Sequence, residues 1–136
     1  MNEAGIQSYE VSNYARPGEE SRHNLTYWTG GDYIGIGPAA HGRLGLSATE
    51  SPKSVDKWLK NGICTETLTP QERFEENVLM GLRLTHTPFP TKGLSQTGIR
   101  KAQNLGWITL SDDGKMLTPT LNGTLILNKL ILMLLP

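Results

Sequence analysis

The chain has 136 residues, which suits one ordinary domain or two small ones. Its 13 basic residues balance 13 acidic residues, and this neutrality argues against a dedicated nucleic-acid-binding protein, whose phosphate contacts need a basic surplus. The single cysteine, Cys64, excludes an internal disulfide and a cysteine-based metal cage, and it fits a reducing cytoplasm.

The first half is rich in glycine and predicts two short strands among loops. Alternating side chains over residues 8–14 predict the first strand, and a Pro17-Gly18 turn follows it. Residues 32–37 predict a second strand that is apolar on both faces, as a covered parallel strand would be. Between them, residues 22–28 (RHNLTYW) crowd polar and aromatic side chains into an expected loop, which indicates a ligand site.

A helix is predicted after this region. Ser51 is a suitable cap, Pro52 suits the first helical position, and Gly62 ends the pattern. One face of this helix is expected to be apolar, with Val55, Trp58 and Leu59.

The second half has clearer helix signals. Thr69 and Glu72 form a capping box at the start of a helix that we expect to run to about residue 85. Its apolar stripe consists of Phe74, Val78 and Leu82.

Three further elements complete the predicted chain. They are a helix over 95–105, a hairpin turning at Asp113-Gly114, and a helix over 121–135. The order helix, helix, hairpin, helix predicts a small winged-helix-like domain. The apolar C-terminal run is shorter than the ~20 residues that a membrane-spanning helix needs, so we expect it to be a buried helix.

The run GIGPAA has the letters of a dinucleotide-binding fingerprint, with Gly35, Gly37 and Ala40 in place. That fingerprint requires a helix directly after it to receive the pyrophosphate, and Pro38 and Gly42 argue against one. A nicotinamide or flavin site is therefore not expected. The glycines instead predict a strand end that closely approaches either a ligand or another strand.

Two of the three histidines lie in the glycine-rich first half, but their spacing does not predict a metal site. His23 and His41, with Asp32 or Cys64, match no zinc pattern. His23 differs from an ordinary structural histidine in its neighbours, because Tyr27 and Trp28 offer aromatic walls and Asn24 an orienting amide. Such a set suits a flat cofactor such as a porphyrin, although the spacing alone also fits a purely structural role.

Other chemistries find less support. Adjacent Glu19 and Glu20 point apart in any regular element, and no arrangement resembles a nucleophilic triad. The helix expected to recognise DNA carries only Arg100 and Lys101 as cations, which favours a packing module.

Residues 9–44 resemble the later part of the catalytic barrel of radical-SAM proteins of the HemW type. These heme chaperones are grouped with the oxygen-independent coproporphyrinogen III oxidases. The segments YEVSNYA, RHNLTYW and YIGIGPAAHG occur in the family's order and spacing, and LMGLRL and LGWITL resemble its C-terminal domain. RHNLTYW is the most specific segment and favours the chaperone branch.

The resemblance implies an α/β fold plus an α+β domain, that is, the last strands of a partial (β/α) barrel followed by the winged-helix-like domain. We expect the barrel piece at 1–62, a linker at 63–68 and the second domain at 69–136. The resemblance implies heme binding by four residues of one segment: His23, Asn24, Tyr27 and Trp28. It also implies that four residues line an S-adenosylmethionine pocket: Gly35, Gly37, Ala40 and His41.

The chain departs from the family because it lacks the CxxxCxxC motif that holds a 4Fe-4S cluster. We therefore expect a C-terminal portion of a longer heme-handling protein, without radical chemistry of its own. The missing barrel would be its partner, and exposed strand edges favour self-association or local disorder before about residue 45. The competing hypothesis is a winged-helix module that binds nucleic acid or a protein.

Overall fold

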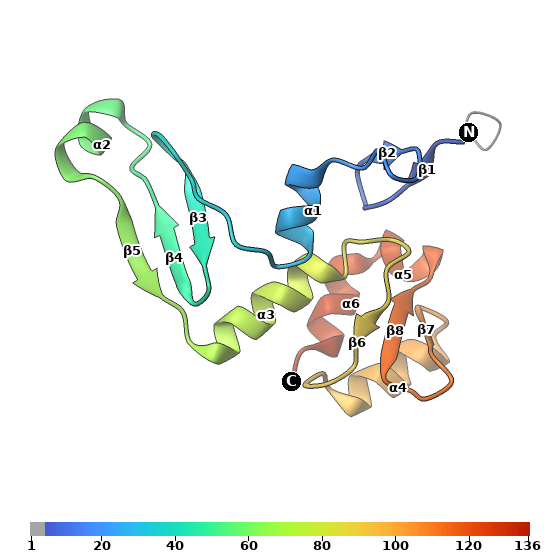
Figure 1. Ribbon diagram of the computed structural model, residues 1–136. Coiled ribbons are helices and arrows are strands. Elements are labelled where there is room, and N and C mark those ends of the chain that lie inside the picture. The colour runs from blue at the N-terminus through green and yellow to red at the C-terminus, as the bar shows by residue number, and fades with distance from the viewer. Residues whose placement is uncertain (1–4) are drawn as a thin grey trace.

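The computed structural model describes residues 5–136, which form a mixed α/β fold with three small antiparallel sheets (Figure 1). The helices are α1 (Arg22–Trp28), α2 (Val55–Asn61), α3 (Pro70–Gly81), α4 (Gln96–Asn104), α5 (Leu121–Leu125) and α6 (Leu127–Leu134). The strands are β1 (Gln7–Ser8), β2 (Tyr14–Ala15), β3 (His41–Leu44), β4 (Ser47–Glu50), β5 (Cys64–Thr67), β6 (Phe89–Pro90), β7 (Ile108–Leu110) and β8 (Met116–Pro119). None of the helices in this part of the chain is long and apolar enough to cross a membrane.

The N-terminal hairpin corrects the single strand predicted over 8–14. The chain reverses within that range, so that β1 and β2 pair with each other. The Tyr9 amide donates to the Asn13 carbonyl at 3.2 Å, which closes the turn. Glu10, at the turn, is almost fully buried and forms an isolated bridge with Leu84. The hairpin is thereby joined to the segment that follows α3.

A second sheet, with the order β3-β4-β5, was not predicted. Its strands are short and largely polar, so they lack the alternation of apolar residues that marks a half-buried strand. Gly45, at φ 57°, occupies the left-handed region in the β3–β4 turn. β5 lies inside the expected linker 63–68, where it pairs with β4. Figure 1 shows this sheet beyond one end of α3, away from the C-terminal elements.

The prediction of a covered parallel strand over 32–37 is wrong. Only Tyr33 pairs, in an antiparallel bridge with Arg43 of β3. Ile34 and Ile36 point outward and are 72% and 87% exposed. The segment follows one edge of the sheet, and its apolar side chains are not covered by the described residues.

Helix α2 begins later than predicted. Its cap is Ser54, whose hydroxyl accepts from the Lys57 amide at 3.4 Å, and not Ser51. Its end at Gly62 is confirmed. The apolar face exists but is not packed, since Val55 and Leu59 are 56% and 71% exposed.

The capping box of α3 is confirmed. The Thr69 hydroxyl accepts from the Glu72 amide at 3.2 Å, and the Glu72 carboxylate accepts from the Thr69 amide at 2.8 Å. These bonds satisfy two backbone donors at the helix start that would otherwise lack partners. The helix ends at Gly81, four residues before the predicted end at 85.

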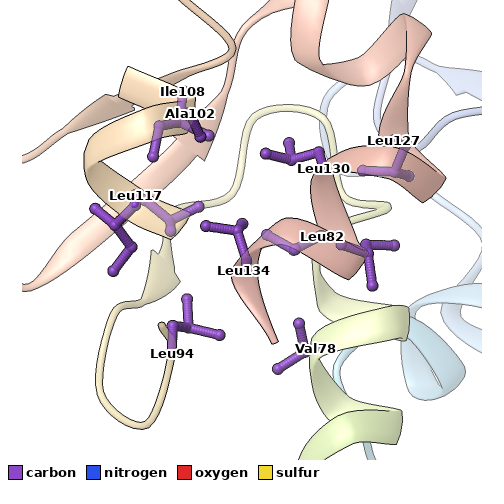
Figure 2. Packing of buried hydrophobic residues seen from close by; sticks show 11 residues of the cluster. Val78, Leu82, Leu94, Ala102, Ile108, Leu117, Leu127, Leu130 and Leu134 are labelled. Atoms are coloured by element: carbon purple, nitrogen blue, oxygen red, sulfur yellow. The ribbon is translucent and has the colours of Figure 1, made fainter. Parts of the chain in front are cut away.

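The C-terminal half packs around one hydrophobic core (Figure 2). The predicted α4 and hairpin are confirmed, and β8 pairs with both β6 and β7. The predicted final helix is divided into α5 and α6 at Ile126, where φ is −120°. The core residues come from α3, α4, α6, the β-hairpin and the loop before α4: Val78, Leu82, Leu94, Ile99, Ala102, Ile108, Leu117, Leu127, Leu130, Ile131 and Leu134.

Removal of the α3 cap tests its contribution to stability. We expect Thr69→Ala to lower the free energy of unfolding by about 1 kcal/mol, because the Glu72 amide loses its acceptor. Urea denaturation followed by circular dichroism measures the change. Thr87→Ala, at an exposed threonine in a loop, is the control, and an equal loss in both variants would contradict the capping role.

Candidate functional site

The RHNLTYW segment forms helix α1, which corrects the expectation of a loop. The segment contains no glycine or proline, and Ser21 caps it by accepting from the Asn24 amide at 3.4 Å. A helix places residues four apart on one face. His23 and Tyr27 therefore share one face, and Asn24 and Trp28 share the next.

His23 and Tyr27 are in direct contact. The Tyr27 hydroxyl lies 2.9 Å from His23 Nε2, and the two rings meet edge to face with their centroids 4.7 Å apart. Tyr27 in turn meets Tyr33 edge to face at 4.4 Å. The three rings form a continuous aromatic row from exposed His23 toward the sheet.

The inner end of this row has altered acidity. Burial raises the pKa of the Tyr33 hydroxyl above its ordinary value, and the positive charge of Arg43 offsets part of that rise. The Tyr33 hydroxyl therefore loses its proton less readily than that of an ordinary tyrosine.

Asn24 and Trp28 make different contacts. The side-chain amide of Asn24 donates from Nδ2 to the Tyr9 hydroxyl at 3.1 Å, which connects α1 to the N-terminal hairpin. The Arg83 guanidinium lies 5.5 Å from the centroid of the Trp28 ring, a cation–π distance. The four predicted heme-binding residues thus lie on one helix, but the described structure does not bring them together around one cavity.

Trp28 lines a cavity of about 400 Å³, at the junction of α1, α3 and the loop that leads to β6. Its lining residues are Trp28, Thr29, Phe74, Asn77, Gly81, Leu84, Thr87, Pro88, Phe89, Pro90 and Lys92. The sequence analysis missed this cavity, because its three segments are brought together only by the fold. Phe89, the aromatic residue in HTPFP, was the only local signal.

The four residues predicted to line an S-adenosylmethionine pocket lie beside the β3 edge. A Cβ at Gly35 would lie 2.2 Å from the His41 carbonyl oxygen, so the close approach predicted there is to another strand. Gly37, at φ 98°, occupies the left-handed region, and the Ala40 carbonyl accepts from the Ser51 amide at 2.8 Å. His41 is exposed and begins β3.

A charged network joins the sheet to α3, and it was also missed by the sequence analysis. Glu76 accepts from Arg43 at 2.8 Å and from Arg73 at 2.7 Å. Arg73 also donates to the Gly30 carbonyl at 2.7 Å, just after α1. Burial alone would raise the pKa of Glu76, but the hydrogen bonds from both arginines outweigh it and hold that pKa below its ordinary value.

The side chains present suit only one of the implied cofactors. A 4Fe-4S cluster needs three cysteine thiolates, and the sequence contains one cysteine, so the residues present do not fit a cluster. Among residues 5–136, no group of three or more His, Cys, Asp or Glu side chains is placed to hold a metal ion. Heme iron takes an imidazole as an axial ligand, and the exposed His23 ring, with Tyr27 beside it, offers one.

No protein-family model matches the chain. Heme chaperone HemW of Bacillus subtilis is 39% identical over 92 residues, covering 62% of this chain and 24% of the relative. The mitochondrial radical S-adenosyl methionine domain-containing protein 1 of Bos taurus is 41% identical over 98 residues, covering 61% of this chain and 22% of the relative. Heme chaperone HemW of Escherichia coli is 57% identical over 44 residues, covering 32% and 12%.

The fold also has a solved counterpart. Coproporphyrinogen III oxidase (HemN) from Escherichia coli, described as a radical SAM enzyme, matches with a TM-score of 0.64 at 14% identity, over 97% of this chain and 37% of that chain. The chain spans about a quarter of the length of the HemW of Bacillus subtilis and of the bovine relative. The resemblance to HemW-type radical-SAM proteins is confirmed: the chain is a homologue, over about 60% of its length, of proteins named heme chaperone HemW and radical SAM domain-containing protein 1.

Proposed function

We propose that this chain is part of a heme-handling protein and binds heme at α1, with His23 as the axial ligand. The observation that carries the proposal is the exposed His23 ring, held by Tyr27 within a segment that resembles the HemW type. Heme supplies an iron that takes an imidazole nitrogen as its axial ligand. The Tyr27 hydroxyl bonds to Nε2 and so orients the ring, which would leave Nδ1 as the nitrogen for the iron. A ligating histidine is commonly oriented in this way by a hydrogen bond to its other ring nitrogen.

The proposal extends to the domain plan. Residues 1–62, of which the first four lie outside the described part, would be the end of a radical-SAM barrel, connected through 63–68 to a winged-helix-like domain at 69–136. The likeness to HemN over nearly the whole chain supports a common fold. The helices α3 and α4 precede the β7–β8 hairpin, and α5 and α6 follow it, in the order expected of a winged helix.

The longer protein would contribute what this chain lacks. Three cluster thiolates and most of the S-adenosylmethionine pocket would come from the rest of the barrel, so the chain is expected to be inactive in radical chemistry alone. Gly35, Gly37, Ala40 and His41 remain the residues proposed to lie near that cofactor. Cytoplasmic location and self-association through strand edges remain predictions. The competing module for nucleic acid or a protein gains no support from the relatives.

A hemin titration tests the heme assignment. We expect a saturable shift of the Soret band with the purified chain, and loss of that shift in His23→Ala. His41→Ala is the matched control, because His41 is also exposed but lies in β3 and not on α1 or the loop before β6. Equal shifts in all three proteins would remove His23 as the ligand. Absence of any shift in a folded chain would contradict heme binding by α1.

A further inference from the structure

We propose that the cavity between α1, α3 and the loop before β6 receives one carboxylate-bearing edge of a porphyrin ring. The inference rests on the proposed heme function and names a part of the binding surface that His23 does not form. The cavity volume of about 400 Å³ is near the lower end of small-molecule sites. That size suits an edge of a large ring and not the whole macrocycle.

The walls suit a flat, apolar ligand. Trp28 comes from α1, Phe74 from α3 and Phe89 from β6, so three aromatic side chains from separate segments border the same space. Leu84 and the prolines of the loop add further apolar surface. Aromatic rings contribute large apolar areas and favour stacked or edge-on contact with another ring.

Two of the aromatic rings that line the cavity pack against glycines. A Cβ at Gly81 would lie 2.4 Å from the Phe89 ring, and a Cβ at Gly93 would lie 2.8 Å from the Phe74 ring. Both rings therefore pack directly on backbone that carries no side chain. Neighbouring structure thus restricts the positions of both rings, which favours a preformed surface.

The charge of the residues that line the cavity favours a ligand with a carboxylate. Lys92 is the one charged residue among the residues that line the cavity, and no acidic side chain lines it. Lys92 is exposed and has no acidic partner within residues 5–136. A porphyrin carries carboxylates at its edge, and an ammonium group at the rim would pair with one of them.

Two lining residues also contain incompletely bonded polar atoms. Trp28 Nε1 and Asn77 Oδ1 are buried and lack hydrogen-bond partners among the described residues. Buried groups of this kind are rare in native proteins and often mark a place where a water or ligand binds. Trp28 and Asn77 both line the cavity, so a ligand with a polar edge would supply a partner that these side chains lack.

Fluorescence titrations with metal-free protoporphyrin IX and with its dimethyl ester test the inference. Without iron, binding does not depend on His23 ligation, so His23→Ala should bind both compounds as the natural sequence does. We expect Lys92→Glu to weaken binding of the free acid at least about tenfold, the size of one charge-assisted hydrogen bond. Binding of the ester should be unchanged.

Two further variants sharpen the test. Lys101→Glu reverses another exposed charge, on α4, and should leave both affinities unchanged. Thr87→Trp places a large ring at a lining position and should weaken both the acid and the ester. Because Thr87 and Lys92 are both exposed, neither change threatens folding.

The outcomes separate this inference from the heme assignment. Equal binding of the free acid by Lys92→Glu and Lys101→Glu would overturn the cavity site, and the hemin result would stand. Binding of the free acid that depends on Lys92, without a hemin shift that depends on His23, would overturn the ligand assignment and leave the cavity site in place.

Discussion

Leu130→Ala is expected to lower the free energy of unfolding by about 2–5 kcal/mol, the range for leucines truncated in a packed core. Leu130 lies on α6 and is fully buried in the core shown in Figure 2. The substitution removes three carbon atoms from the core and leaves a cavity that the other core residues fill only in part. Urea denaturation followed by circular dichroism measures the loss.

Leu132→Ala is the matched control on the same helix. Leu132 is 76% exposed, so the same chemical change should alter stability by no more than about 0.5 kcal/mol. A loss in Leu132→Ala as large as that in Leu130→Ala would mean that α6 is covered on its outer face in solution. A small loss in both variants would contradict the core described here.

The elements of the second half were largely predictable because their signals are local. Thr69 and Glu72 lie three residues apart, and both bonds of their capping box form. Ser95 and Leu105 border α4 as its periodicity predicts. The division between α5 and α6 was missed, because the apolar pattern of 121–135 suggested one helix, although Asn122, Gly123 and Thr124 are weak helix formers.

The first half was harder to predict because its structure depends on distant contacts. The strands β3 to β5 have polar side chains on both faces, so hydrophobic periodicity does not mark them. The apolar run at 32–37 does have a strand's composition, but only Tyr33 finds a strand partner. For α1, the crowding of polar and aromatic side chains suggested a loop, although the segment contains neither glycine nor proline.

The candidate site also combines contacts that local spacing predicts with contacts that depend on the fold. The contact of His23 with Tyr27 follows from their spacing once the helix is known. The cavity beside Trp28 and the contact of Arg43 with Glu76 join residues far apart in sequence. No local pattern records such contacts, so they emerge only from the fold.

The network around Glu76 has a structural consequence for α1. Arg73 links the Glu76 carboxylate to the carbonyl of Gly30, and Arg43 links it to β3. The segment that follows α1 is thus held between the sheet and α3. Because Tyr33 lies in this segment and supports Tyr27, the network holds the aromatic row in place.

Glu76→Gln is expected to lower the free energy of unfolding at pH 7 by about 1–3 kcal/mol, because two partly buried arginines lose their anionic acceptor. Glu75→Gln, at an exposed neighbour on α3, should change it by no more than about 0.5 kcal/mol. Since the pKa of Glu76 is lower in the folded chain than its ordinary value near 4.5, the ionised carboxylate stabilises the fold above that value. This contribution is lost as the pH falls through the lowered pKa. The difference in stability between the natural sequence and Glu76→Gln should therefore shrink on acidification, in urea titrations from pH 7 to acid. A difference that stays constant over that range would show that the charge of Glu76 does not stabilise the junction between the sheet and α3.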